Sequence, residues 1–196
     1  AHKGVIDLRS WDFDRDGNVS LDGEWAFRWK TFLMPGTFPD SSNPISYVSI
    51  PRKWNDLIVD EKKLSGTGHA TYRLRILTTK TNPILSLKIF DISSSYNLFV
   101  NKVLIDSNGH ISANQDSMVA NFSPKVVSFP IQSDTTELVL HISNAIHCEG
   151  GIRSQILLGT QQSVQRSHNL AYMLNLLLTG AMLILFIYHF WMFLLR

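Results

Sequence analysis

Most of the chain alternates apolar and polar residues with the two-residue period of β-strands. Residues 24–30 place three aromatic side chains on one face, and residues 71–76 and 85–90 repeat the alternation with aliphatic and tyrosine side chains. Because successive side chains of a strand point to opposite faces, each segment has one core face and one more exposed face. The aromatic residues that share the first core face are Trp25, Phe27 and Trp29. Further apolar runs predict strands at residues 96–100, 103–105, 126–131, 138–143 and 152–158.

Turn-forming segments separate these runs, and no long stretch of helical period lies between them. Asn101 and Lys102 stand between two apolar runs and predict a tight hairpin turn. Roughly nine or ten short strands without intervening helices favour an all-β fold, and within that class a β-sandwich. Loops on such a sandwich are the usual place for binding residues. We expect these loops at residues 34–43, 55–68, 107–124 and 145–151.

The C-terminal part is different, because residues 169–195 contain no Asp, Glu, Lys or Arg over 27 positions. About 20 apolar residues are enough to cross the core of a bilayer as a helix. We therefore predict a transmembrane helix at residues 169–195, with aromatic residues and Arg196 suited to the membrane interface at its end. The uncharged length disfavours the alternative of a buried helix in a soluble protein. The chain then divides into a domain at residues 1–160, a polar linker at 161–168 and the helix.

Composition agrees with the division of the chain into a polar domain and an uncharged helix. Charged residues make up 17% of the chain, below the roughly 25% of a soluble domain. One of the 18 basic residues is Arg196, so residues 1–168 hold 17 basic and 16 acidic residues and a net charge of +1. Nucleic-acid-binding domains carry a basic patch, so nucleic acid is excluded as a partner. The single cysteine, Cys148, excludes an intramolecular disulfide and any CxxC pair.

Two clusters suggest metal or catalytic chemistry but have the wrong spacing. Residues 12–20 reproduce the first half of a calcium-binding loop, but the twelfth position, which needs a bidentate Glu, is Gly23. His147, Cys148 and Glu149 are adjacent, and neighbouring side chains in an extended chain point to opposite faces. The chain has no P-loop, GxSxG or HExxH pattern. We therefore expect no catalytic residue, no metal site and no cofactor.

Saccharide recognition needs flat apolar surface for sugar rings and planar polar groups for hydroxyls. The predicted loops supply this mixture, and the glycine pair at residues 150–151 allows close approach of the backbone. For Trp54 and Tyr96 the competing interpretation is packing in the core, where large aromatic side chains dominate. The candidate ligand-binding residues are His147, Arg153, Trp54, Asp56, His69, Tyr96 and Asn97.

Several segments carry a resemblance to a known family. LDGEWAFRW at residues 21–29, IPRKWND at 50–56 and HISNAIHCEGGI at 141–152 precede an apolar helix that ends in FLLR. Together with GHATYRLRI, SSYNLFVN and ILLG, they make the chain resemble the periplasmic sensor domain (extracellular domain 2) of bacterial seven-transmembrane receptors with diverse intracellular signalling modules. The DGEW and IPRKW elements are shared with the sugar-binding sandwich of β-galactosidase-type glycoside hydrolases. The S-N-x-x-H-x-x-G-G stretch followed by a membrane helix is more specific to the receptors.

The resemblance implies a galactose-binding-like jelly roll outside the bacterial inner membrane, a carbohydrate or related small-molecule ligand, and the first of seven transmembrane helices. The leading hypothesis is therefore the ligand-sensing region of a membrane signalling receptor, with residues 1–168 in the periplasm or extracellular space. An intracellular output domain is expected beyond Arg196.

Two alternatives remain open. The sandwich could act without a small ligand, as a protein-interaction module or a homodimerisation module of the receptor. It could also be an accessory sugar-binding domain of a glycoside hydrolase. The predicted membrane helix argues against this second alternative, because a catalytic barrel should follow the sandwich instead.

Overall fold

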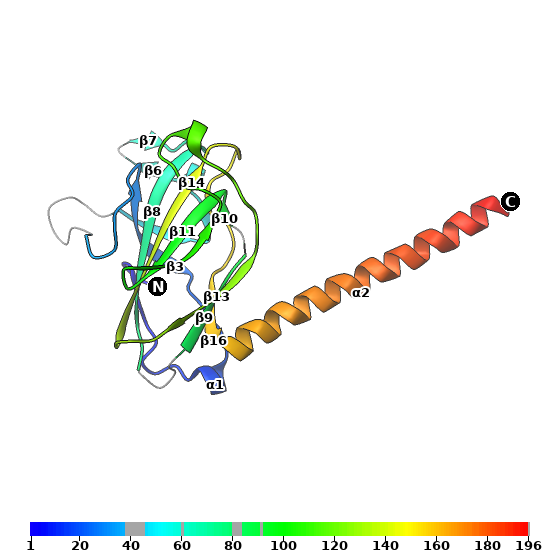
Figure 1. Cartoon of the computed structure of the whole chain (residues 1–196), viewed down its shortest axis with the longest axis horizontal. Coiled ribbons are helices and arrows are strands. Elements are labelled where there is room, and N and C mark those ends of the chain that lie inside the picture. Colours follow the sequence, from blue (N-terminus) through cyan, green and yellow to red (C-terminus); the bar gives the residue numbers. More distant parts are fainter. Residues whose placement is uncertain (38–45, 60, 80–83, 91, 196) are drawn as a thin grey trace.

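A computed structural model describes residues 1–37, 46–59, 61–79, 84–90 and 92–195 of the chain. Within these residues, short strands pack as a β-sandwich, and one long helix projects from it (Figure 1). The alternation of apolar and polar positions therefore predicted the β-rich fold class correctly.

The larger sheet has seven strands in the order β12-β11-β14-β8-β3-β4, and β1 lies parallel to β8 beside this path. The other pairings of this sheet are antiparallel. The two ten-residue strands β8 and β14 pair along their whole length and form its centre. The seven strands are β1 (Val5–Asp7), β3 (Gly23–Trp29), β4 (Ser46–Ile50), β8 (Gly68–Leu77), β11 (Ser95–Val100), β12 (Val103–Asn108) and β14 (Thr135–Asn144).

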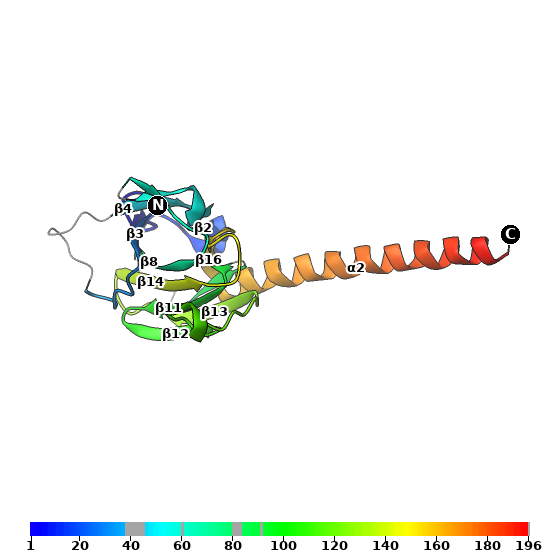
Figure 2. The same cartoon turned by 90° about the horizontal axis from the view of Figure 1, so that it is seen from above.

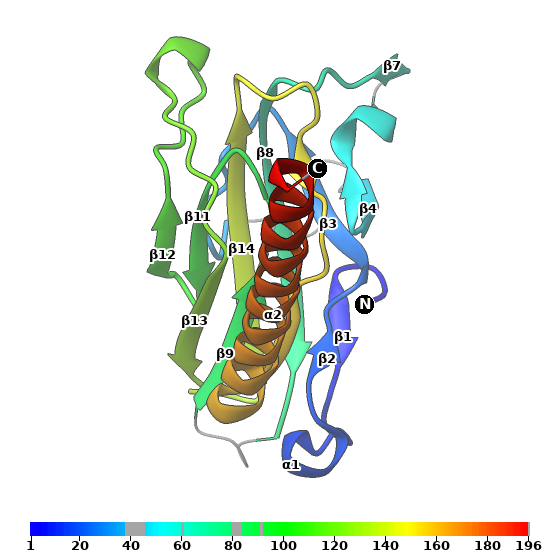
Figure 3. The ribbon, with the colours of Figure 1, turned by 90° about the vertical axis from the view of Figure 1, so that its right-hand side faces the viewer.

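The smaller sheet has four strands in the order β13-β9-β16-β2. They are β2 (Val19–Ser20), β9 (Ile84–Ile89), β13 (Lys125–Pro130) and β16 (Leu157–Thr160). Figure 3 shows β9 and β13 in front of the larger sheet, on the side from which helix α2 (Gln161–Leu194) projects.

Short elements connect the two sheets. Three two-residue strands form the order β10-β15-β5, and two more form the hairpin β6-β7. These short elements are β5 (Arg52–Lys53), β6 (Ile58–Val59), β7 (Lys62–Lys63), β10 (Ile92–Ser93) and β15 (Gly151–Ile152), with the short helices α1 (Phe13–Asp16), η1 (Trp54–Asp56) and η2 (Gln115–Ser117).

The core lies between the two sheets, where one cluster of buried side chains joins them. Trp25 and Phe27 of β3 are 0% and 1% exposed, and the Phe27 ring meets the Tyr72 ring of β8 edge to face at 4.9 Å. Leu85 and Leu87 of β9 belong to the same cluster from the smaller sheet. The predicted core faces of these three strands are therefore confirmed, and burial of each large side chain contributes about 1.5–3 kcal/mol.

The opposite face of β8 differs from the predicted, more exposed face. Thr71 is fully buried, because the segment that follows β3 lies across it, and Arg73 is 8% exposed and pairs with Glu137 of β14 at 3.1 Å. Thr71 Oγ1 donates to the carbonyl of Thr31 at 2.7 Å and accepts from the backbone nitrogen of Leu33 at 3.0 Å. His141 of β14 contacts the carbonyl of Leu33 through Nε2 at 2.8 Å. A strand pattern carries no information about a loop that covers its polar face.

The predicted hairpin turn is confirmed. Asn101 and Lys102 connect β11 to β12 and have positive φ angles of 47° and 74°. Two consecutive residues with positive φ make the turn type whose twist matches that of paired strands.

Helix α2 begins directly after β16, so residues 161–168 are its first two turns. Thr160, the last residue of β16, caps the helix by accepting from the backbone nitrogen of Ser163 at 3.3 Å. Val164 is fully buried, and the start of the helix contacts the smaller sheet. Beyond this contact the helix extends away from the sandwich (Figure 2) and is long and apolar enough to cross a membrane. Arg196, expected at the membrane interface, lies outside the described residues.

Candidate functional site

An open hollow of about 930 Å³ lies at the end of the sandwich that is remote from α2. Three strands of the larger sheet meet it, because β3 and β14 end there and β8 begins there. The β6-β7 hairpin and the segment around η2 form its walls. Strand ends from a rigid sheet therefore hold one side of the hollow, and loops form the other side.

The lining of the hollow is mixed in character. Trp29, Leu64 and Met118 contribute apolar surface. Three lysines and one aspartate contribute charge: Lys30, Lys62, Lys63 and Asp116. Hydroxyl and amide side chains also belong to the lining, at Ser65, Thr67, Ser112, Asn114, Gln115 and Asn144. Such a surface offers both a ring-sized apolar contact and several hydrogen-bonding groups to one ligand.

Close packing fixes Trp29 at the edge of the hollow. Its ring lies 4.9 Å from the buried ring of Trp54 at an interplanar angle of 73°. A Cβ on Gly68 would lie 2.5 Å from the Trp29 ring, and Gly68 has a φ of 149°, a conformation that favours glycine. The half-buried indole is therefore held in place before any ligand arrives.

His69 lines the hollow, as the sequence predicted for a binding residue. Its ring packs against Phe32 at 4.8 Å, and Phe32 also contacts the ring of His141 at 5.1 Å. Burial lowers the pKa of both imidazoles, and the charge of Lys30 lowers the pKa of His69 further. Both histidines are therefore neutral near pH 7, and the positive charge of the hollow comes from its lysines.

A second polar cluster lies beside the hollow and fixes the loop at residues 145–151. We call it the asparagine clamp, which consists of Asn144 and Asn55. The Asn144 amide nitrogen donates to the carbonyls of Gly66 at 2.7 Å and His147 at 2.8 Å. Its oxygen accepts from the backbone nitrogen of His147 at 3.0 Å and from the hydroxyl of Ser94. Because Asn144 is only 1% exposed, these partners replace water.

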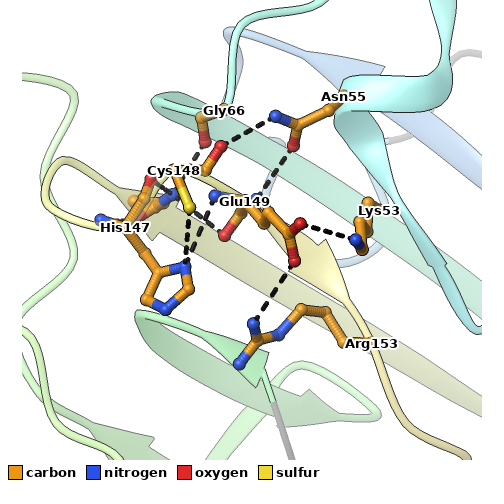
Figure 4. Close-up of polar contacts among 9 residues, drawn as sticks. Lys53, Asn55, Gly66, His147, Cys148, Glu149 and Arg153 are labelled. Carbon is orange, nitrogen blue, oxygen red and sulfur yellow. Dashed lines mark hydrogen bonds and ion pairs between the residues drawn. The ribbon is translucent and has the colours of Figure 1, made fainter.

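Asn55 also holds this loop, through two hydrogen bonds to its backbone (Figure 4). Its amide nitrogen donates to the carbonyl of Cys148 at 2.9 Å, and its oxygen accepts from the backbone nitrogen of Gly150 at 3.0 Å. Trp54 Nε1 donates to the carbonyl of Gly66 at 2.9 Å. A Cβ on Gly150 would lie 2.1 Å from the Trp54 ring, so the loop lies against the indole only with glycine there. The S-N-x-x-H-x-x-G-G stretch thus closes a loop.

Charged side chains beside this loop pair with one another (Figure 4). Lys53 Nζ donates to Glu149 Oε1 at 2.6 Å, and Arg153 lies 3.7 Å from Oε2 of the same carboxylate. The hydrogen bond from Lys53 holds the pKa of Glu149 below its usual range. His147 Nδ1 lies 3.4 Å from the backbone nitrogen of Glu149 and 3.9 Å from Cys148 Sγ. These contacts organise the loop and leave the carboxylate paired with cations.

The structure contradicts the prediction that Trp54 and Tyr96 contact a ligand. Their side chains are 0% and 1% exposed and belong to the core cluster. The Tyr96 hydroxyl donates to Asp106 at 2.9 Å, and burial raises the pKa of Tyr96. Large aromatic rings bury more apolar area inside a sandwich than at its surface, so the competing core interpretation is correct for both.

The structure separates the remaining predicted site residues. Asp56 is exposed at the end of η1. Asn97 accepts a hydrogen bond from a serine of the neighbouring strand at 2.8 Å. His147 and Arg153 belong to the charged cluster beside the clamp. Of the seven candidates, His69 is the one that lines the described hollow.

Most of the residues that line the hollow were not predicted from the sequence. Lys30, Lys62 and Lys63 were not singled out, nor were Asn114 and Gln115. The last four lie inside loops that the sequence did predict as places for binding residues. The adjacent pair of lysines in a predicted loop was the one signal in the sequence that could have indicated them. The alternation of apolar residues does not reveal such a pair.

The segment that begins like a calcium loop forms a capped turn of helix. Asp12 precedes α1 and accepts from the backbone nitrogen of Asp14 at 3.0 Å, while Asp16 pairs with Arg15 at 2.8 Å. In the part of the chain that the structure describes, no group of three or more His, Cys, Asp or Glu residues could hold a metal ion.

No protein-family model matches the chain, and no curated protein matches it. Solved structures do match the chain. A β-glucuronidase from Ruminococcus gnavus in complex with uronic isofagomine matches 72% of this chain and 28% of its own, with 14% identity and a TM-score of 0.55. A GH2 β-galacturonidase from Eisenbergiella tayi bound to galacturonate matches 73% of this chain and 24% of its own, with 14% identity and a TM-score of 0.50. The chain therefore shares a β-sandwich fold with about a quarter of each enzyme.

Proposed function

We propose that this chain is the ligand-sensing region of a bacterial membrane signalling receptor. The sandwich is a galactose-binding-like jelly roll in the periplasm, the hollow binds a carbohydrate or a related small molecule, and α2 is the first of seven transmembrane helices. An intracellular output domain carries the response. In this role the chain binds its ligand and does not catalyse a reaction.

The hollow is the observation that carries the proposal. It combines a fixed, half-buried indole at Trp29 with hydroxyl groups at Ser65 and Thr67 and amides at Asn114 and Gln115. A sugar ring presents an apolar face and a rim of hydroxyls, and such a surface complements both. Because strand ends hold one side of the hollow, little ordering is needed when a ligand binds, which favours affinity.

The fold supports a carbohydrate ligand. Both solved structures named above are enzymes named for uronic acid substrates, and each was solved with a ligand of that class or a uronic analogue. A sandwich that recurs in proteins acting on saccharides makes a saccharide the first ligand class to test.

The connection to α2 supports a role in signalling. The helix starts at the residue after β16 and rests on the smaller sheet through Val164, so no irregular linker absorbs a displacement of the sandwich. Ligand binding shifts such an element only if the ligand has different affinities for its two positions.

A binding experiment tests the sensor. The full chain in detergent micelles is titrated by calorimetry with a panel of neutral monosaccharides, disaccharides and sugar acids. We expect saturable binding to at least one, weakened about tenfold or more by the double substitution Asn114→Ala and Gln115→Ala, since each lost hydrogen bond costs about 0.5–1.5 kcal/mol. The matched control, Gln162→Ala with Gln165→Ala at the start of α2, should leave binding unchanged.

Absence of binding to every sugar would overturn the sensor, and concentration-dependent association of the chain would then favour the interaction module. Binding that survives loss of Asn114 and Gln115 would place the ligand outside the hollow.

A labelling experiment tests the topology. Cys148 is exposed and is the chain's single cysteine, so it reports the compartment of the sandwich without engineering. We expect a membrane-impermeant maleimide to label it in cells whose outer membrane has been permeabilised. A second variant, Cys148→Ser with Leu195→Cys, should be labelled only after lysis. The reverse pattern would contradict a periplasmic sandwich.

A further inference from the structure

Three lysines line the hollow, and they come from two separate parts of the chain. Lys30 follows β3, and Lys62 with Lys63 forms strand β7 of the hairpin opposite. Lys30 adopts a left-handed φ of 53°, and its backbone nitrogen donates to the carbonyl of His69 at 2.8 Å, which fixes its position at the rim. All three side chains are exposed to the hollow's solvent.

Two other lysines of the domain pair with carboxylates. Lys53 pairs with Glu149 at 2.6 Å, and Lys125 pairs with Asp106 at 2.9 Å. Within the described residues, Lys30, Lys62 and Lys63 form no ion pair. Asp116 is the one carboxylate among the described residues that line the hollow. The lining therefore has an excess of two positive charges in a domain that is otherwise almost neutral.

We infer that the hollow selects an acidic saccharide, a sugar that carries a carboxylate, over the neutral sugar of the same stereochemistry. This inference rests on the proposed function, because it names the ligand class of the same site. The carboxylate binds at the lysine-lined rim, to Lys30 and to the lysine of β7 whose side chain faces it, and the ring lies toward Trp29. Lysine ammonium groups are point charges that hold an anion without demanding one fixed geometry, which suits a site on a hairpin and a strand end.

Amide and hydroxyl groups of the lining favour a sugar acid over a simple inorganic anion. Ser65, Thr67 and Asn114 line the hollow beside the lysines and extend its hydrogen-bonding surface to the hydroxyl groups of a sugar ring. The volume of about 930 Å³ is also far larger than one tetrahedral anion needs. Both features are used only if the ligand extends beyond its charged group.

Paired ligands test the inference on the full chain in detergent micelles. Galacturonate is compared with galactose, and glucuronate with glucose, since each pair differs only at the carboxylate. In about 50 mM salt we expect the acid to bind at least about tenfold more tightly, because charge-assisted hydrogen bonds are roughly twice as strong as neutral ones. In about 500 mM salt the preference should shrink, since salt screens exposed charges.

Charge variants assign the effect to these lysines. Lys62→Gln with Lys63→Gln should bring the affinity for the acid close to that for the neutral sugar. Asp116→Asn should strengthen binding of the acid about two- to threefold by removing a repulsive charge. Lys102→Gln is the matched control, since Lys102 lies in the turn at the other end of β11 and β12.

The outcomes separate this inference from the proposed function. Equal affinities for acid and neutral sugar, both lost with Asn114→Ala and Gln115→Ala, would overturn the charge preference and leave the sensor standing. An acid preference that persists without Lys62 and Lys63 would also overturn the inference, as would inorganic phosphate competing with a sugar acid at equal concentration. Failure of every sugar to bind would overturn both.

Discussion

The asparagine clamp and the lysine-lined hollow are neighbours, but their polar groups are satisfied in opposite ways. In the clamp, the amides of Asn144 and Asn55 find all their partners inside the chain. In the hollow, Lys30, Lys62 and Lys63 form no ion pair among the described residues. The conspicuous S-N-x-x-H-x-x-G-G stretch therefore maintains the shape of its loop. The less conspicuous lysines of the hollow are available to a ligand.

The largest effect is expected where the clamp meets the core. Trp54→Ala should lower the free energy of unfolding by about 3–5 kcal/mol, because it removes a fully buried indole and leaves a cavity. Urea denaturation of the full chain, followed by circular dichroism, measures the change. Lys63→Gln in the hollow should stay within about 0.5 kcal/mol of the parent chain. Similar losses of stability for the two variants would show that the lysines of the hollow contribute to the fold as much as the buried indole does.

Asn144→Ala should cost about 3 kcal/mol, somewhat less than Trp54→Ala, since it leaves buried carbonyl and N–H groups of the loop without partners. In the same variant, the rate of hydrogen exchange of the loop amides at His147 and Gly150 should rise. Gln115→Ala removes an exposed amide from the hollow and is the matched control for stability. A loop that stays protected without Asn144 would show that other contacts close it.

The two imidazoles packed around Phe32 predict a moderate dependence of stability on pH. Burial lowers the pKa of His69 and His141 in the folded chain, so the unfolded chain binds protons first as the pH falls. The free energy of unfolding should therefore decrease below about pH 6.5. His141→Gln keeps a hydrogen-bond donor toward Leu33 but cannot titrate, and it should flatten this slope. An unchanged slope would mean that other groups cause it.

The smallest effect is expected for the ion pair of Lys53 and Glu149. Glu149→Gln should leave the stability at pH 7 almost unchanged, because solvent screens an exposed pair. The lowered pKa of Glu149 implies a contribution that is present above its unfolded value of about 4.3 and is lost as the pH falls through the folded value. Urea midpoints of the parent chain and the variant, compared between neutral and acidic pH, measure it. A large loss at pH 7 would mean that the pair, and not the clamp, holds the loop.

Local patterns were sufficient to predict most of the long strands, because the information lies within each segment, but the run predicted as one strand at residues 152–158 is paired only at its two ends, in β15 and β16. The alternation around Trp25 and around Tyr72 identifies the core faces, and Asn101 with Lys102 identifies a turn. The burial of Thr71 on the other face of β8 was not predictable in this way. It depends on Leu33 and its neighbours, which lie about forty residues away in sequence.

The residues that line the hollow were not predictable from the sequence, for a related physical reason. Trp54 and His147 attract attention because of their residue types, yet one packs inward and the other belongs to an organised loop. The hollow instead depends on which strand ends meet, and it brings together Lys30, the hairpin that contains Lys62 and the segment that contains Asn114. Composition does not show which segments come together. The excess of positive charge in the hollow is therefore visible only in the fold.

The junction between β16 and α2 gives the molecule a mechanical property. Thr160 is both the last residue of a paired strand and the cap of the helix. No loop residue therefore separates the strand from the helix. A straight helix of 34 residues is about 51 Å long, at about 1.5 Å per residue. A tilt of about 5° at this junction would move the far end by about 4 Å, which makes α2 a lever that enlarges small motions of the sandwich.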